Sequence, residues 1–165
     1  MKLVKPAALL AAALIVGIAS GIAISSTDAW AQARPVAQQK AAAAKVHKVA
    51  IQVNQNEKGV MDLALNNAKN VVDYYKGKGE QVVVEIVTYG PGLHMLRSES
   101  PVKERVAAMS LELPQLTFAA CGNTQASMSK AEGKPVTLLS EAKVTPSGVV
   151  RLMELQGQGY AYIRP

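Results

Sequence analysis

Cys121 is the residue best suited to nucleophilic chemistry, because it is the only cysteine among the 165 residues of the chain. It stands between an apolar stretch at 116–120, typical of a short strand, and a segment that predicts a helix from about residue 124. A helix N-terminus carries free N–H groups and a partial positive charge, and both favour a thiolate over a thiol. The alternative is a small buried residue at the end of a core strand.

His94 is the candidate partner of this thiol, because a Cys–His pair is one way to activate sulfur. The alternative is a histidine that caps a loop or bonds a carbonyl group. The other histidine, His47, falls inside a predicted strand and is interpreted as structural. One cysteine and two histidines do not have the spacing of a zinc site, so we expect neither a metal nor a cofactor.

The strands and helices that position Cys121 and His94 can be predicted from the apolar pattern of the sequence. Apolar and β-branched runs predict strands at 46–53, 81–87, 116–120, 136–139 (with a possible extension through 144) and 160–163. Amphipathic segments predict helices at about 57–76, 100–111, 124–131 and from about 146. This order predicts an α/β protein: three α/β/α layers around a mostly parallel five-stranded sheet, with helices on both faces.

The carboxyl ends of parallel strands gather at one edge of such a sheet, where ligands commonly bind. We expect this edge to bring together the residues that follow each strand. Cys121 is the candidate reactive residue and His94 its candidate partner. The candidate binding residues are Asn54, Gly90, Gly92, Gly122, Asn123, Thr124 and Ser147.

The N-terminal residues predict export. Lys2 and Lys5 precede an uncharged apolar run at 6–24, and small-x-small cleavage sites follow at 29–33. We therefore expect a signal peptide at 1–31, a flexible tether at 32–45 and one domain at 46–165, in a periplasmic or secreted protein. The alternative is an uncleaved segment that anchors the chain in the membrane.

The charge of the chain argues against a nucleic-acid partner. Its net charge is +6, but the basic residues are spread along the sequence. They do not form a cluster with interleaved aromatic side chains, so we expect no nucleic-acid binding.

Several segments together resemble the DsrE/DsrF-like proteins, and in particular an exported branch of that family. These segments are VHKVAIQVNQN (46–56), ALNNAKNVVDYY (64–75), VEIVTYGPGLHML (84–96), FAACGNT (118–124) and PSGVVRLMELQGQGYAYIRP (146–165). The resemblance implies a DsrEFH-like, flavodoxin-like domain that assembles into homo-oligomers.

For function, the resemblance implies sulfur relay, in which Cys121 carries a persulfide between a sulfur donor and an acceptor protein. A carrier is then expected rather than a turnover enzyme. The alternative is an oligomeric module for small-ligand binding or assembly, in which the cysteine is buried and structural.

Overall fold

The computed structural model describes residues 46–165, so the expected signal peptide and tether lie outside the described residues. The described residues 46–165 belong to one compact unit by their internal contacts, and this unit contains both hydrophobic clusters of the structure. It therefore holds a complete core of its own. Within the described residues, no helix has the length and apolar character needed to cross a membrane.

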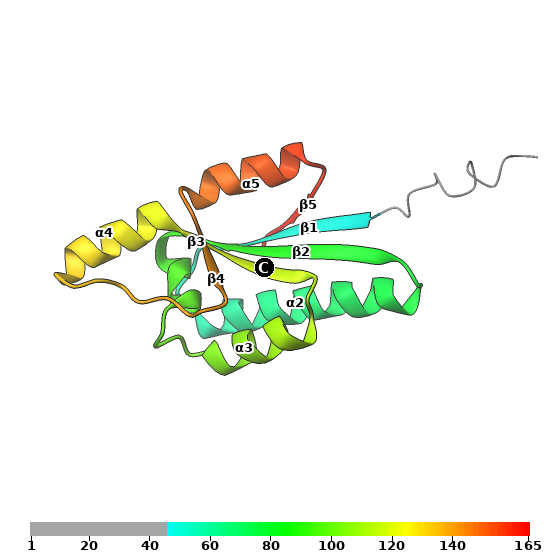
Figure 1. Cartoon of the computed structure of the whole chain (residues 1–165), viewed down its shortest axis with the longest axis horizontal. Coiled ribbons are helices and arrows are strands. Elements are labelled where there is room, and N and C mark those ends of the chain that lie inside the picture. Colours follow the sequence, from blue (N-terminus) through cyan, green and yellow to red (C-terminus); the bar gives the residue numbers. More distant parts are fainter. Residues whose placement is uncertain (1–45) are drawn as a thin grey trace, which may run out of the picture. The chain divides into compact units, whose positions relative to one another are not determined.

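The centre of this unit is a five-stranded sheet, drawn in Figure 1. Its strands are β1 (Val46–Val53), β2 (Gln81–Thr88), β3 (Leu116–Cys121), β4 (Ala142–Thr145) and β5 (Ala161–Ile163). They lie in the order β4-β3-β2-β1-β5, and every pair is parallel. The predicted α/β fold with a parallel five-stranded sheet is thus confirmed.

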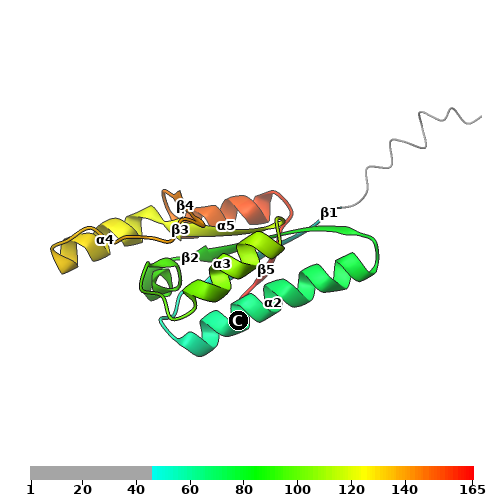
Figure 2. The same cartoon turned by 60° about the horizontal axis from the view of Figure 1, so that its bottom comes forward.

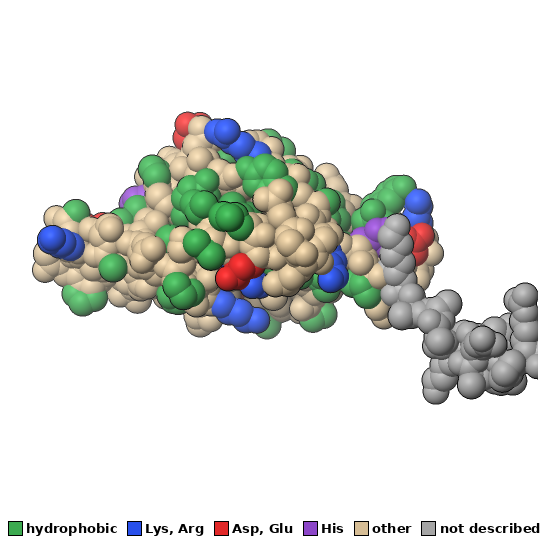
Figure 3. Space-filling model, turned by 90° about the horizontal axis from the view of Figure 1, so that it is seen from above, with side chains coloured by type: hydrophobic (Ala, Val, Ile, Leu, Met, Phe, Trp, Pro, Cys, Tyr) green, Lys and Arg blue, Asp and Glu red, His purple; other side chains and the backbone are tan. Residues whose placement is uncertain are grey.

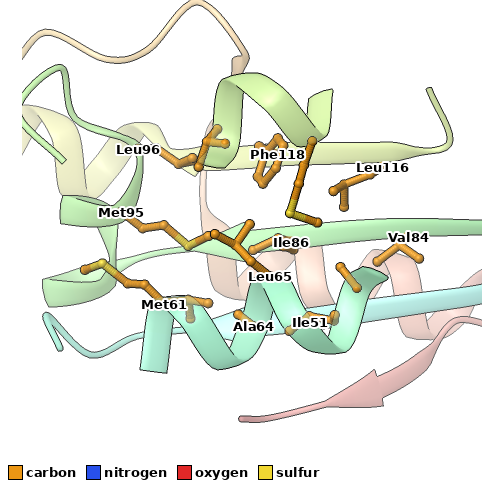
Figure 4. Packing of buried hydrophobic residues seen from close by; sticks show 14 of the residues in the cluster. Ile51, Met61, Ala64, Leu65, Val84, Ile86, Met95, Leu96, Leu116 and Phe118 are labelled. Carbon is orange, nitrogen blue, oxygen red and sulfur yellow. The ribbon is translucent and has the colours of Figure 1, made fainter. Parts of the chain in front are cut away.

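One face of the sheet carries the larger core. It is covered by α2 (Lys58–Gly77), the 3-10 helix η2 (Gly90–Leu96) and α3 (Lys103–Glu112). The predicted apolar stripe of α2 is buried here, including Met61, Leu65 and Val72. Figure 4 shows Met61 and Leu65 packed with Ile86, Met95 and Phe118 from neighbouring elements. Burial of this stripe fixes α2 along the sheet.

The opposite face carries a single helix, α5 (Gly148–Gly157), as Figures 1 and 2 show. Its Leu152 and Leu155 pack on Ala50, Val87 and Ala119. These three small or medium residues alternate with the residues of the larger core, as the period of two in a strand requires. Because only one helix covers this face, part of the sheet beside it stays open.

Helix α4 (Gly122–Glu132) covers neither face and has no buried residue. In Figures 1 and 2 it projects beyond the end of the sheet. The chain returning from it is bound to the domain by Ser98 N–H, which donates to Thr137 O, and by Leu139 N–H, which donates to Leu96 O. We call α4 with residues 133–141 the arm.

The predicted strand at 136–139 is wrong. These residues run along the arm and make only an isolated antiparallel bridge between Arg97 and Leu138. The strand that pairs with β3 begins later, at Ala142. The local pattern misplaced the strand because Val136 is buried and Leu138 half-buried within the arm, so their apolar character reflects packing of the arm and not pairing in the sheet.

The predicted helix start at Ser100–Pro101 is also shifted. The Ser100 hydroxyl accepts the Val102 N–H at 3.3 Å, as a capping serine would, but α3 begins at Lys103. A turn therefore occupies the position where the sequence pattern predicted the first helical residues.

The connections leave the sheet in different directions near the end of β3. The chain after β2 enters η2 and α3 on the α2 side, whereas the chain after β4 enters α5 on the other side. Such a divergence opens a crevice at the carboxyl ends of the strands between them. In this protein β3 lies between those two strands, and Cys121 is its last residue.

Candidate functional site

Cys121 lies at the N-termini of two helices. It is the N-cap of α4, where its Sγ accepts the Thr124 backbone N–H at 3.4 Å. The backbone N–H groups of Gly148, at the start of α5, and of Asn123 also face the sulfur. Burial disfavours the thiolate, but these donors outweigh it, so the pKa of Cys121 is lowered below its usual value. The predicted position at a strand–helix junction is confirmed.

Gly148 allows the second helix to come this close. A Cβ atom at Gly148 would lie 2.8 Å from the Tyr89 Cβ and 3.3 Å from the Cys121 Cβ. Gly122 is similarly tight, since its Cβ would lie 3.2 Å from the Thr145 carbonyl oxygen. The two helix N-termini can converge on the thiol because neither position has a side chain.

Thr124 links the cysteine to the loop after β2. Its Oγ1 accepts the Gly90 N–H at 2.9 Å, and its side chain also acts to lower the pKa of Cys121 against the opposing effect of burial. The oxygen is thus the acceptor for Gly90, and the O–H is left to donate to the thiolate. The positive φ of Gly90, 52°, suits a glycine and turns its N–H toward Thr124.

The sulfur is enclosed as well as stabilised. Cys121 is 5% exposed, and it is the free cysteine of the described residues. A disulfide between two copies would need its Cβ within about 3.5–4.5 Å of its partner's, which this burial does not allow without movement of the loops. The site therefore suits small reagents better than a second protein thiol.

His94 is not joined to Cys121 by any hydrogen bond among residues 46–165. It is half-buried in η2, and it lies near enough to Glu132, at the far end of α4, to lower the pKa of that carboxyl. The groups that set the Cys121 pKa are Thr124 and backbone N–H groups. The pairing of His94 with the thiol remains a prediction that these contacts do not support.

Some of the other predicted binding residues contribute groups to the thiol, and others have a role in packing. Asn123 and Thr124 contribute N–H groups to the sulfur. Gly92 is a packing residue, because its Cβ would lie 2.1 Å from the Val53 carbonyl oxygen. Ser147 precedes α5 as its N-cap, but its side chain makes no capping bond. The N–H group that reaches the sulfur comes from the next residue, Gly148, which sequence reasoning missed.

A polar cluster at the ends of β1, β2 and β5 was also missed. The Gln52 amide donates to the Tyr89 hydroxyl at 2.6 Å, and its oxygen accepts the Tyr162 hydroxyl. Burial raises the pKa of Tyr89, although the Asn54 side chain opposes this shift. The sequence signal for this cluster was weak, because Gln52 falls inside an apolar strand pattern and its partners lie 37 and 110 residues away along the chain.

Within residues 46–165, no group of three or more His, Cys, Asp or Glu side chains is placed to hold a metal ion. The arrangement around Cys121 consists of hydrogen-bond donors. It can therefore hold negative charge on the sulfur.

Fold and site together define an α/β protein with a thiol held at the carboxyl edge of a parallel sheet. No protein-family model matches the chain, and no curated protein matches it either. Among solved structures, the chain is similar to MTH1491 from Methanobacterium thermoautotrophicum, a protein of unknown function. The two are 28% identical with a TM-score of 0.62, and the match covers 72% of this chain and 99% of the other. The similarity supports the fold and names no activity.

Proposed function

We propose that this chain is an exported, DsrE-like sulfur carrier that holds sulfur on Cys121 as a persulfide. The observation that carries the proposal is the convergence of two helix N-termini on one thiol, whose pKa is lowered despite its burial. A thiolate is the reactive form of cysteine toward sulfane sulfur. The DsrE-like resemblance of the sequence supports the same role.

The proposed reaction is a thiol exchange with a low-molecular-weight persulfide. The Cys121 thiolate attacks the outer sulfur of the donor R–S–SH, and a new S–S bond forms as the donor's S–S bond breaks. The donor leaves as the thiolate R–S⁻, and Cys121 becomes Cys–S–SH. A second thiolate reverses the step and takes the sulfur away, so no external oxidant or reductant is needed.

The N–H groups around Cys121 suit both states of such a carrier. They stabilise the thiolate before transfer, and the persulfide is itself an anion that needs donors. The absence of a hydrogen-bonded base among the described contacts of Cys121 agrees with a carrier that starts as a thiolate.

The test is mass spectrometry of residues 42–165 after incubation with glutathione persulfide. We expect one added sulfur on Cys121, which dithiothreitol removes and which Cys121→Ser lacks. A companion measurement is the pH dependence of iodoacetamide alkylation, with a midpoint below that of free cysteine. A chain that takes up no sulfur and alkylates no faster than free cysteine at neutral pH would refute the proposal.

The burial of Cys121 favours a second candidate, a binding or assembly module with a structural cysteine. This role predicts slow alkylation of the native protein. It also predicts that Cys121→Ser changes stability and nothing else. The alkylation experiment therefore separates the two candidates.

We further propose that the chain forms homo-oligomers through the outer side of α5. Val149, Val150 and Met153 are 50%, 50% and 66% exposed there, and Figure 3 shows hydrophobic side chains gathered over this helix. An exposed apolar group of this kind commonly marks an interface. Sizing of residues 42–165 tests this, with Met153→Glu expected to shift the assembly toward monomer and Leu63→Glu, on α2, as the matched control. A wild-type monomer at micromolar concentration would contradict it.

A further inference from the structure

The open part of the sheet beside α5 contains a groove of about 490 Å³. This volume lies within the range of small-molecule sites. The groove is lined by residues of β2, β3 and β4, by Arg151 of α5 and by residues of the neighbouring connections, and Cys121 is not among its lining residues. It exists because α5 packs only on the centre of this face, against Ala50, Val87 and Ala119.

The floor of the groove is apolar at several positions. Val83, Pro114 and Ala119 line it, together with Tyr160. Strand register makes Lys143 on β4 the direct neighbour of Ala119 on β3. The apolar floor therefore ends at a lysine on the outer strand.

The charges of the groove leave a positive excess. Arg151 is held by Glu85, with Nε and Nη2 at 2.7 and 2.8 Å from the two carboxylate oxygens. Its Nη1 has only a long contact, 3.5 Å, to Glu154. Lys143 also lines the groove, and no acidic side chain of the described part of the chain pairs with it. Two cations and one carboxylate thus line one cavity.

The Glu85–Arg151 pair gives the guanidinium a fixed position. Glu85 is 8% exposed in the central part of β2, where an apolar residue would cost less to bury. The bidentate bond directs Arg151 across the sheet face and leaves Nη1 available at the groove. Thr117, the strand neighbour of Glu85 on β3, adds a hydroxyl group to the lining of the groove.

We propose that this groove binds a small amphipathic anion, with its anionic group between Lys143 and Arg151 and its hydrocarbon body over Val83 and Ala119. Charge complementarity selects an anion, because Lys143 lacks a partner in the groove. The apolar floor selects a ligand with a hydrocarbon part over a bare inorganic ion. A medium-chain carboxylate has both features. The site is separate from Cys121 and does not depend on the proposed sulfur chemistry.

The experiment is an NMR titration of ¹⁵N-labelled residues 42–165 with decanoate. We expect saturable shifts of the amide signals of Thr117, Ala119 and Lys143. Lys143→Gln should weaken binding about fivefold to tenfold, as loss of one charge-assisted contact does. Lys103→Gln, which removes the same charge from α3 on the other face of the sheet, should leave binding unchanged.

Four results would overturn the proposal. Decanoate could leave the three signals unmoved, or decyltrimethylammonium could bind as well as decanoate. Inorganic phosphate alone could bind as tightly, which would remove the role of the apolar floor. The same three signals could instead shift on dilution without ligand, which would show that a second copy of the chain occupies the groove.

Discussion

The backbone nitrogen of Thr124 lies 3.4 Å from the sulfur of Cys121, and the Thr124 side chain acts to lower the pKa of the same thiol. One residue in the first turn of α4 thus acts on the thiol through both its backbone and its side chain. Its Oγ1 also accepts the Gly90 N–H, so the loop after β2 holds the rotamer that directs the hydroxyl. This arrangement makes Thr124 the side chain whose removal should change Cys121 most.

Thr124→Val should raise the pKa of Cys121 by about one pH unit, because it removes the hydroxyl that favours the thiolate and keeps the shape of the side chain. The measurement is the rate of iodoacetamide alkylation against pH. Ser127→Ala, in the next turn of α4, is the control and should leave the midpoint unchanged. If Thr124→Val also leaves it unchanged, the hydroxyl does not stabilise the thiolate.

Gly148→Ala should destabilise the domain by about 1–3 kcal/mol, because its Cβ would lie 2.8 Å from the Tyr89 Cβ and must displace α5. The same displacement moves the Gly148 N–H away from Cys121, so the thiol pKa should rise. Gly157→Ala, at the other end of α5, meets no atom within 4 Å and is the matched control. Urea unfolding and alkylation measure the two effects, and equal stability of the two variants would count against the close approach.

The stability of the native protein should depend on pH through Cys121. Its pKa is lower in the folded state than in the unfolded state, so its ionisation adds stability above the unfolded thiol pKa of about 8.5. That contribution is lost as the pH falls through the folded pKa. Cys121→Ser should therefore cost more free energy of unfolding at about pH 9.5 than at about pH 6. A cost that does not vary with pH would show that the folded thiol is not preferentially ionised.

Glu132→Gln should loosen the arm. Glu132 ends α4 and binds Arg97 through two contacts of 2.5 and 3.0 Å, while Arg97 is 7% exposed. Arg97 lowers the pKa of Glu132, so the pair holds above the ordinary glutamate pKa and weakens as the pH falls through the lowered value. Hydrogen exchange should report faster exchange at Val136 and Leu139 in the variant.

The control for the arm is Glu141→Gln, because Glu141 bonds only to the neighbouring Ser140 hydroxyl. It should leave exchange at Val136 and Leu139 unchanged. Protection that stays the same in Glu132→Gln would mean that the backbone bonds to Leu96 and Ser98 hold the arm without the ion pair.

The sequence by itself determined the parallel α/β architecture and the place of Cys121 within it. Strand and helix periodicities depend on local spacing, so the stripe of α2 and the apolar run of β2 could be interpreted without knowledge of their partners. The position of Cys121 between β3 and α4 followed from the same local reasoning. The strand predicted at 136–139 was wrong because an apolar residue is buried equally well in the arm or in a sheet.

Only the tertiary structure decided what surrounds the thiol and which face of the sheet stays open. The Gly148 N–H reaches Cys121 from 27 residues away, and Arg151 reaches Glu85 across 66 residues. Contacts of this kind depend on where α5 crosses the sheet, which no local pattern specifies. The position of Cys121 between a strand and a helix could thus be predicted from the sequence. Its contact with the N-terminus of a second helix and its burial depend on the packing of α5.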